Sequence, residues 1–309
     1  MWAAVLTEQP KEIRLQEMAP PVLGENEVLI KVDYCGVCGS DLHAYNHAKG
    51  YEFVPRPIVP GHEIAGTVVD VHPSVSADWL GRRVIVESMQ YCGSCPNCVR
   101  GRTNACMHQQ VIGLHFNGGM AQFVKVRVRY VQPIPENVPN KVAALCEPMA
   151  IAVHAVDRAP EVTGESTILV QGPGIIGLFV ALVCKERGAQ VVLSGLAGVD
   201  ELRLDIARSF GLTIHRVGEN ALKQPFDVVF ECAGTQAAIE YGFQHLQKGG
   251  TCVHVALYEQ PSTLFLTDVV RKEWTIQTAY GCCPKDYTQA FRLLTLYQTQ
   301  MEAVVSEFS

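Results

Sequence analysis

Four cysteines close together constrain this 309-residue chain more than any other feature of its sequence. They follow the spacing C-x2-C-x2-C-x7-C and are Cys92, Cys95, Cys98 and Cys106. Four thiolates in one short loop form the closed tetrahedral ligand set of a structural zinc ion. Iron–sulfur clusters use similar runs and are the alternative, whereas disulfides are disfavoured because the other eight cysteines stand singly among apolar residues. A structural zinc does no chemistry, so the reactive site is expected elsewhere.

The composition is that of a globular chain with a large core, since 48% of the residues are apolar and 18% are charged. The formal charge of -6 and the absence of a Lys/Arg block argue against a nucleic-acid partner. The N-terminus does not have the pattern of a signal peptide, and no apolar run reaches the ~18 residues of a membrane span. Twelve cysteines without an export signal predict a cytoplasmic location, where thiols bind metals or pack in cores.

The character of the chain changes near residue 150. Before that point, short apolar segments separated by Gly, Pro and Asn predict a β-rich lobe. The expected strands are Val28–Val32, Ile64–Val71, Arg83–Val86, Ala121–Val126 and Tyr130–Ile134. The segment Val142–Arg158, rich in Ala and Val, is predicted to be helical.

From Thr167 onward, strand-like and helix-like segments alternate. The expected strands are Thr167–Gln171, Gln190–Ser194, Asp227–Cys232, Thr251–Ala256 and Glu273–Thr278, and the expected helices are Ile175–Arg187 and Asp200–Phe210. Such alternation predicts an α/β fold with a parallel, doubly wound sheet. We therefore divide the chain into a β-rich lobe (1–150), an α/β lobe (151–285) and a C-terminal segment (286–309).

A glycine-rich turn joins the first strand and helix of the α/β lobe. Gly172, Gly174 and Gly177 follow the pattern G-x-G-x-x-G, and Ile175 and Ile176 open the helix. The first glycine allows a tight turn, the second lets the backbone approach a pyrophosphate, and the third lets helix and strand pack closely. Because the free N–H groups of the helix attract phosphates, we expect a dinucleotide here. A glycine turn without a ligand is the alternative.

The choice between NAD and NADP depends on the residues after the second strand of this lobe. An NAD site normally carries Asp or Glu there, but Ser194 and Gly195 occupy the position. No basic residue that would hold a 2′-phosphate precedes Arg203. Asp200 or Glu201 can replace the missing acid, which favours NAD over NADP. An equal alternative is that Asp200 only starts the next helix.

A second group of metal-binding residues lies in the β-rich lobe. Cys38, His62 and Glu63 offer a thiolate, an imidazole and a carboxylate, the three-ligand set of a catalytic zinc with one open position. Taken singly, Cys38 is also typical of a core cysteine and His62 of a turn. Ser40 and His43 can carry a proton between such a metal and solvent. A turn serine and a surface histidine are the alternatives.

Glu147 is an acid in an otherwise apolar segment, directly before Pro148. Because a buried acid needs a partner, we expect Glu147 to face the metal directly or through water. A place in the first turn of a helix is the alternative, and the two interpretations are compatible.

With these motifs, the chain resembles the zinc-dependent medium-chain dehydrogenase/reductase family, and most closely its polyol branch of sorbitol, threonine and butanediol dehydrogenases. The resemblance rests on segments in the family's order: Gly36–His43, Gly61–Glu63, the four-cysteine lobe, Gly118–Ala121, Cys146–Pro148 and Gly172–Gly177. The chain departs from the family at Arg82 and Gly195. Relatives also continue beyond the equivalent of Ser309, so we expect a shortened protein.

The resemblance implies a GroES-like catalytic domain followed by a Rossmann domain. It implies a catalytic zinc on Cys38, His62 and Glu63, with Glu147 as a direct or water-linked fourth ligand. Ser40 and His43 match the positions of the family's proton relay. The family also forms homo-oligomers, dimers or tetramers, through the edge of the Rossmann sheet, here 273–280.

We therefore expect a cytoplasmic, zinc-dependent oxidoreductase. It would transfer a hydride between a secondary alcohol of a polyol or sugar-derived substrate and NAD or NADP. The alternatives are a threonine or sugar-acid dehydrogenase, and a non-catalytic regulatory protein of the same fold that binds zinc and a nucleotide.

Overall fold

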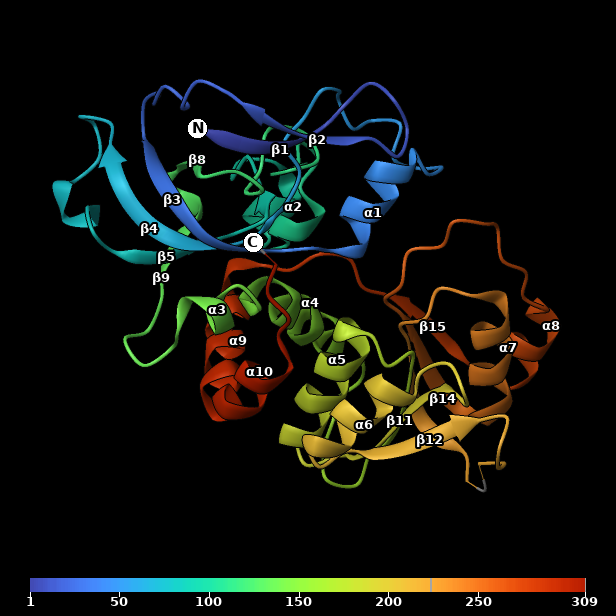
Figure 1. The fold of residues 1–309 in the computed structure, drawn as a ribbon. Helices are drawn as coiled ribbons and strands as arrows, with labels where there is room; N and C mark the ends of the chain where they lie inside the picture. The colour runs from blue at the N-terminus through green and yellow to red at the C-terminus, as the bar shows by residue number, and fades with distance from the viewer. Residues whose placement is uncertain (223, 309) are drawn as a thin grey trace. The chain divides into compact units, whose positions relative to one another are not determined.

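The computed structural model describes residues 1–222 and 224–308. The chain forms two compact units (Figure 1): the first comprises Met1–Glu147 and Cys283–Ser309, and the second Pro148–Cys282. Among the described residues, none of the helices combines the length and the apolar character needed to cross a lipid bilayer.

The first unit is built on an antiparallel sheet of five strands in the order β8-β3-β4-β5-β9. These strands are β3 (Glu27–Gly36), β4 (Glu63–Val71), β5 (Arg83–Val86), β8 (Phe123–Arg127) and β9 (Val131–Pro133). Each contributes β-branched residues to one core, among them Val28, Ile30, Ile64, Val68, Val84, Val86, Val124 and Val126. All five strands predicted for the β-rich lobe are present, with ends shifted by a few residues.

Shorter elements complete the first unit. Its remaining strands are β1 (Trp2–Leu6) paired with β2 (Ile13–Glu17), and β6 (Met89–Gln90) paired with β7 (Gln110–Val111). Its helices are α1 (Gly39–Asn46), α2 (Pro96–Val99), α3 (Asn140–Ala143), α9 (Pro284–Leu296) and α10 (Gln298–Val304), with 3-10 turns at Ala77–Trp79, Thr103–Ala105 and Val128–Tyr130. The helix predicted over Val142–Arg158 is α3 followed by α4 (Cys146–Asp157), which runs across the boundary between the units.

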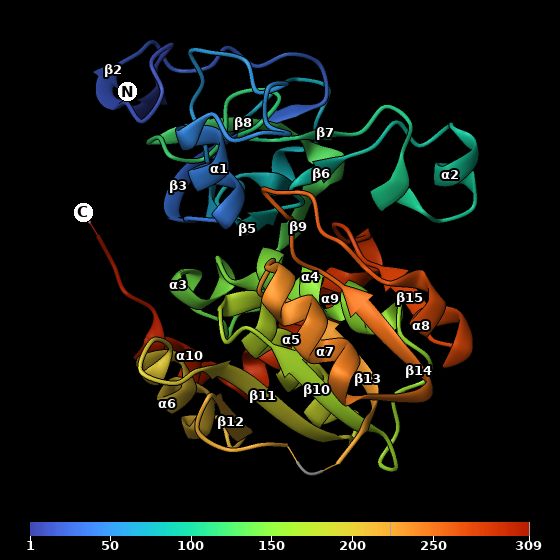
Figure 2. The ribbon, with the colours of Figure 1, turned by 90° about the vertical axis from the view of Figure 1, so that its right-hand side faces the viewer.

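The second unit contains a six-stranded sheet in the order β12-β11-β10-β13-β14-β15, and all its pairings are parallel. The strands are β10 (Thr167–Gln171), β11 (Gln190–Leu196), β12 (Thr213–Val217), β13 (Phe226–Glu231), β14 (Leu246–His254) and β15 (Thr275–Thr278). The connecting helices are α5 (Ile175–Glu186), α6 (Glu201–Ser209), α7 (Gln236–His245) and α8 (Leu266–Arg271). Figure 2 shows the strands side by side with helices packed against them. The predicted doubly wound sheet is confirmed, and β12, α7 and α8 are additions to the predicted elements.

The glycine turn lies where the strand order of this sheet reverses. The chain first winds from β10 to one edge, through β11 and β12, and then returns to β13 on the other side of β10. The N–H of Gly172 donates to the carbonyl of Ser194 at 3.0 Å, and that of Cys232 to the carbonyl of Gln171 at 3.0 Å. The ends of β10, β11 and β13 therefore meet at the turn, which is where open α/β sheets bind ligands.

Candidate metal centres and dinucleotide turn

The sulfur atoms of the four-cysteine loop lie at the corners of a small tetrahedron. The Sγ–Sγ distances are 3.5 Å for Cys95–Cys98 and Cys92–Cys106, and 3.9 Å for Cys92–Cys98 and Cys95–Cys106. Zinc–sulfur bonds of about 2.3 Å place tetrahedral sulfur atoms about 3.8 Å apart. A disulfide needs about 2 Å, and in a cluster the thiolates bind different irons and lie farther apart. The geometry therefore fits a single tetrahedral ion.

Backbone N–H groups point at these sulfur atoms. The N–H of Cys95 donates to Sγ of Cys92, and the N–H groups of Cys92 and His108 donate to Sγ of Cys106, each at 3.3 Å. The backbone donors of Ser94 and Cys95 lower the pKa of the Cys92 thiol to about 5, so it is ready to bind a cation as a thiolate. Figure 2 shows the loop around α2 projecting from the rest of the first unit.

The second metal-binding group is also brought together in the first unit. The donor atoms of Cys38, His62 and Glu63 all lie within 4.8 Å of one another. Antiparallel pairing of β3 with β4 places Gly36 opposite Glu63, and Cys38 follows as the N-cap of α1. A Cβ on Gly36 would lie 1.9 Å from Oε2 of Glu63, so a side chain there would displace the carboxylate.

Asp41 joins the two segments that carry these ligands, a role that the sequence motifs do not reveal. It is buried, and its Oδ2 accepts the N–H of Cys38 at 2.9 Å while its Oδ1 accepts the N–H of Gly61 at 3.0 Å. The same Oδ1 lies 3.7 Å from Nδ1 of His62, a buried nitrogen with no hydrogen bond. In the sequence, the only sign of this role is that Asp41 is an acid three residues after Cys38. A carboxylate behind a metal-binding histidine orients its ring, which leaves Nε2 for the metal.

The electrostatics of this group also suit a cation. Burial, and then repulsion from Glu147, raise the pKa of the Glu63 carboxyl to about 8. Burial opposes a charge on His62, but the hydrogen bond with Cys38 and the nearby acids Asp41 and Glu147 outweigh it and raise its pKa to about 10. Three buried acids, Asp41, Glu63 and Glu147, therefore lie in or near this group, and a divalent cation would compensate their charge. The residues present fit a zinc ion.

Glu147 lies in the first turn of α4 and is buried, and burial raises the pKa of its carboxyl. Its Oε1 accepts the hydroxyl of Ser88 at 2.6 Å. It is not part of the group whose donor atoms lie within 4.8 Å. This geometry favours the water-linked role over direct ligation. Ser88, which follows β5, had no signal in the sequence.

The two predicted relay residues lie on α1. Oγ of Ser40 is 3.3 Å from Nε2 of His62, and His43 follows one helical turn later. The His43 ring lies 5.1 Å from the Tyr51 ring, with an angle of 32° between their planes. Phe53 continues this row, 5.9 Å from Tyr51, and the His115 ring lies 4.7 Å beyond it.

The three glycines of the dinucleotide turn differ in what surrounds them. Gly172 has φ +88°, and a Cβ there would touch Ala233 at 3.0 Å. A Cβ on Gly177 would lie 1.9 Å from the carbonyl oxygen of Gly172. Gly174 has nothing within 4 Å of its Cβ position, and Ile175 beside it is 42% exposed. The first and third glycines thus serve the fold, while the second leaves open space for a phosphate.

Asp200 occupies the space next to Gly195, where the ribose-binding acid is missing. A Cβ on Gly195 would lie 2.8 Å from Cγ of Pro173 and 3.0 Å from Cβ of Asp200. Oδ2 of Asp200 accepts the N–H of Leu196 at 2.9 Å, and Oδ1 pairs with Arg203 at 3.3 Å.

Neighbouring side chains complete this region. The hydroxyl of Ser194, predicted to contact the cofactor, donates to the carbonyl of Val170 inside the sheet at 3.2 Å. Glu201 accepts the N–H of Gly198 at 3.0 Å and pairs with Arg216 at 2.9 Å. Both candidate acids therefore already have a basic partner.

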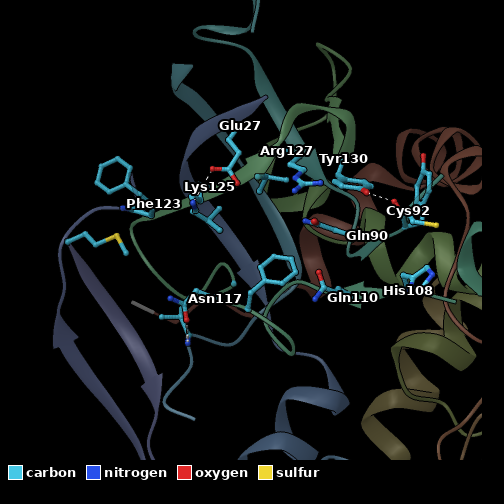
Figure 3. Close-up of a pocket in the computed structure, with 18 residues that line it drawn as sticks. Glu27, Gln90, Cys92, His108, Gln110, Asn117, Phe123, Lys125, Arg127 and Tyr130 are labelled. Atoms are coloured by element: carbon cyan, nitrogen blue, oxygen red, sulfur yellow. Dashed lines mark hydrogen bonds and ion pairs between the residues drawn. The ribbon is translucent and has the colours of Figure 1, made fainter. Parts of the chain in front are cut away.

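A separate pocket of about 520 Å³ lies in the first unit beside β8 (Figure 3). Its lining includes Tyr91, Phe116, Arg127 and Tyr130, and an ion pair between Lys125 and Glu27 at 3.0 Å. It contains Cys92 of the four-cysteine loop but none of Cys38, His62, Glu63 and Glu147. It is therefore distinct from the second group of candidate metal ligands.

The sequence matches two protein-family models, the alcohol dehydrogenase GroES-like domain over residues 24–136 and the zinc-binding dehydrogenase over residues 176–295. It is 32% identical over 304 residues to a sorbitol dehydrogenase of Halalkalibacterium halodurans, covering 94% of this chain and 87% of the relative. It is 33% identical over 300 residues to an L-galactonate-5-dehydrogenase of Escherichia coli K12, covering 94% and 86%. A solved Escherichia coli CFT073 structure, described as a short chain alcohol dehydrogenase complexed with NADH, superposes with a TM-score of 0.86 at 25% identity, covering 96% of this chain and 88% of that one.

Proposed function

Since this chain belongs to the zinc-dependent medium-chain dehydrogenase/reductase family, we propose that it oxidises a secondary alcohol of a polyol, reversibly, with NAD as the hydride acceptor. The predicted family is confirmed, and so is the predicted fold of a GroES-like domain and a Rossmann domain. Zinc-dependent alcohol oxidoreduction with NAD(P) agrees with the relatives, and the non-catalytic alternative is not favoured. We assign catalysis to the first unit and cofactor binding to the second.

The convergence of Cys38, His62 and Glu63 within 4.8 Å carries the proposal. A zinc ion held there would act as a Lewis acid and lower the pKa of a substrate alcohol. We assign to Asp41, 3.7 Å from Nδ1 of His62, the role of orienting that ring, and to Glu147, which accepts the hydroxyl of Ser88, a water-linked role at the metal. We assign to Ser40, whose Oγ lies 3.3 Å from Nε2 of His62, the role of accepting the alcohol proton, and to His43 that of releasing it to solvent.

The site favours a neutral polyol over a sugar acid. Buried acids already surround the ligand group, so a substrate carboxylate beside them would be repelled. The aromatic row of His43, Tyr51 and Phe53 offers apolar faces for the C–H groups of a carbon chain. A sugar-acid or threonine dehydrogenase is the second candidate, and the similarity to an L-galactonate-5-dehydrogenase favours the sugar acid.

A substrate screen tests this function. The zinc-loaded protein is mixed with NAD and, separately, with sorbitol, xylitol, butanediol, threonine and galactonate, and the absorbance of the reduced nicotinamide is followed. We expect turnover with at least one polyol and none after Cys38→Ser. Turnover with galactonate or threonine alone would assign the second candidate. No turnover with any alcohol, in protein that holds two zinc ions per chain, would contradict an enzymatic role.

The preference for NAD over NADP rests on Asp200. Its Cβ lies 3.0 Å from the position that a Cβ on Gly195 would take, so Asp200 is the nearest acid to the usual ribose-binding position. We infer that its carboxylate accepts the ribose hydroxyl groups and would repel a 2′-phosphate. We expect NADH to bind more tightly than NADPH, and Asp200→Ser to reduce that difference about tenfold. Asp205→Asn is the matched control, because Asp205 lies on the same helix and pairs with Arg208. Tighter binding of NADPH by the unmodified protein would instead assign Arg203 and Arg216 as phosphate ligands.

Location and assembly follow as further parts of the proposal. The twelve cysteines, which all lie in the described part of the chain, form no disulfide bond, and this agrees with a reducing cytoplasm. β15 is an edge strand, and its Ile276 and the following Tyr280 are 40% and 52% exposed. Pairing of two such edges would form a homodimer, and two dimers a tetramer. Light scattering in solution tests the assembly. The acidic net charge argues against a nucleic-acid partner.

A further inference from the structure

One fully buried acid, Glu231, ends β13 and organises the loop that follows. Its Oε1 accepts the N–H groups of Ala233 and Gly234, both at 2.8 Å. Its Oε2 accepts the hydroxyl of Tyr258, which lies beyond the end of β14. These three donors satisfy the hydrogen-bonding capacity of the buried carboxylate, and the carboxylate in turn fixes the positions of the three donor groups.

The main chain of the same residue holds the second loop. The carbonyl of Glu231 accepts the N–H groups of Val255 and Ala256 at 2.9 and 3.1 Å. The two loops also pack directly against each other, because a Cβ on Gly234 would lie 3.1 Å from the carbonyl oxygen of Leu257. Glu231 therefore joins two neighbouring loops, residues 232–235 and 255–258, into one hydrogen-bonded network.

Tyr258 connects this carboxylate to a short chain of polar groups. Its hydroxyl lies 2.8 Å from Nδ1 of His254, and Nε2 of His254 lies 3.6 Å from Sγ of Cys252. Because the Tyr258 hydroxyl donates to Glu231, its oxygen accepts a hydrogen bond from the Nδ1–H of His254. The other ring nitrogen of the neutral histidine, Nε2, can then accept a hydrogen bond from the Cys252 thiol. Burial lowers the pKa of His254, and burial and the Glu231 carboxylate raise that of Tyr258, so both stay uncharged.

The position of this network in the sheet indicates its use. β13 and β14 begin the second half of a doubly wound sheet, and the glycine turn belongs to the first half. A Cβ on Gly172 would touch Ala233 at 3.0 Å, so the loop held by Glu231 borders the turn. Sheets with this strand order bind one mononucleotide on each half, with the pyrophosphate at the turn. If the adenosine lies toward Asp200, the other nucleotide lies over the loops after β13 and β14.

We propose that Glu231 and Tyr258 are positioning residues that set the loops 232–235 and 255–258 for the nicotinamide half of the cofactor. This inference rests on the proposed function. It requires no contact between either side chain and the nicotinamide ring, because the network fixes backbone groups that would otherwise have to be ordered when the cofactor binds. Loss of the Tyr258 hydroxyl removes the side-chain bond between the loop 255–258 and Glu231, and leaves the glycine turn and Asp200 unchanged.

The test compares two ligands that differ only in the nicotinamide end, NADH and ADP-ribose. Affinities are measured by calorimetry for the unmodified protein, Tyr258→Phe and Glu231→Gln. Tyr241→Phe is the matched control, because Tyr241 is also a tyrosine paired with a histidine, His215, at 2.8 Å in the same unit. We expect Tyr258→Phe to weaken NADH about tenfold and ADP-ribose less than about twofold. The fluorescence enhancement of bound NADH should fall in parallel.

Each outcome decides the question. Equal weakening of both ligands by Tyr258→Phe would show a general loss of structure, and unchanged NADH binding would show that the network has no part in positioning; either result overturns the inference and leaves the proposed function intact. If the unmodified protein binds neither ligand, the proposed function itself fails. Tyr258→Phe keeps the test decisive even if Glu231→Gln does not fold.

Discussion

Oδ1 of Asp41 lies 3.7 Å from Nδ1 of His62, while Oγ of Ser40 lies 3.3 Å from the other ring nitrogen. A buried carboxylate that also accepts the N–H of Cys38 therefore lies behind the imidazole, within ion-pair distance of it. Carboxylates in this position orient a metal-binding histidine and raise its basicity.

We predict that Asp41→Asn lowers the zinc affinity of this group by about 10- to 100-fold without unfolding the protein. The amide keeps the shape of the side chain but loses its charge. Competition with a chromogenic chelator measures the affinity. Asp70→Asn is the control, because Asp70 is exposed and its carboxylate accepts only its neighbour's N–H among the bonds described. Equal affinities for both variants would remove Asp41 from the metal site.

Two cysteine substitutions should separate the two metal centres. The unmodified protein is expected to hold two zinc ions per chain, and Cys38→Ser and Cys95→Ser one each. Cys38→Ser should lose all measurable activity but keep cofactor binding, because the dinucleotide turn lies in the other unit. Cys95→Ser should instead lower the melting temperature by about 5–10 °C, through loss of metal-coupled folding. Metal analysis and calorimetry check both results. Two zinc ions in either variant would show that the substituted cysteine is not a ligand.

The stability of the metal-free protein should fall as the pH rises. The folded-state pKa of Glu63 is raised from 4.5 to about 8, by burial and then by Glu147. That of His62 is raised from 6.5 to about 10, since Cys38, Asp41 and Glu147 outweigh its burial. The folded state thus binds more protons than the unfolded state. The contribution of Glu63 to stability therefore declines as the pH rises from 4.5 to about 8. For His62 the decline runs between 6.5 and about 10.

Zinc replaces these protons, so the zinc-loaded protein should respond less to pH. Melting temperatures with and without a chelator, measured near pH 6 and near pH 9, check this prediction. The gap between the two forms should widen at the higher pH. A constant gap would contradict the proton-binding behaviour of this group.

Gly174 and Gly177 should respond differently to the same substitution. Gly177→Ala places a methyl group 1.9 Å from the carbonyl oxygen of Gly172 and should destabilise the second unit by about 1–3 kcal/mol. Gly174→Ala meets no protein atom within 4 Å, so the fold should persist while the methyl group blocks the pyrophosphate. Thermal melting and NADH titration separate the two effects. Normal NADH affinity in Gly174→Ala would place the cofactor away from this turn.

Features made of neighbouring residues could be predicted from the sequence. The four cysteines lie within fifteen positions and the three glycines within six, so their spacing alone describes their geometry. The strand β10 was predicted with its observed bounds because it is short, apolar and followed by the glycine turn. The edge strand β12 was not predicted, because its sequence, Thr-Ile-His-Arg-Val, lacks the apolar run of a central strand.

Long-range pairings could not be predicted in this way. Ser88 and Glu147 are 59 positions apart, and Glu231 and Tyr258 are 27 apart. Glu147 stands out in its apolar segment, but no local pattern marks Ser88 as its partner or joins Glu231 to Tyr258.

The amino-acid sequence by itself determined the candidate metal ligands, the order of most strands and helices, and the family, because periodicity and motif spacing are properties of adjacent residues. Only the tertiary structure decided which buried acid meets which donor: Asp41 with the N–H groups of Cys38 and Gly61, Glu147 with Ser88, and Glu231 with two loops. The physical reason is that a buried carboxylate must be satisfied wherever the folded chain brings a donor, and that place depends on the packing of sheets and loops distant in sequence.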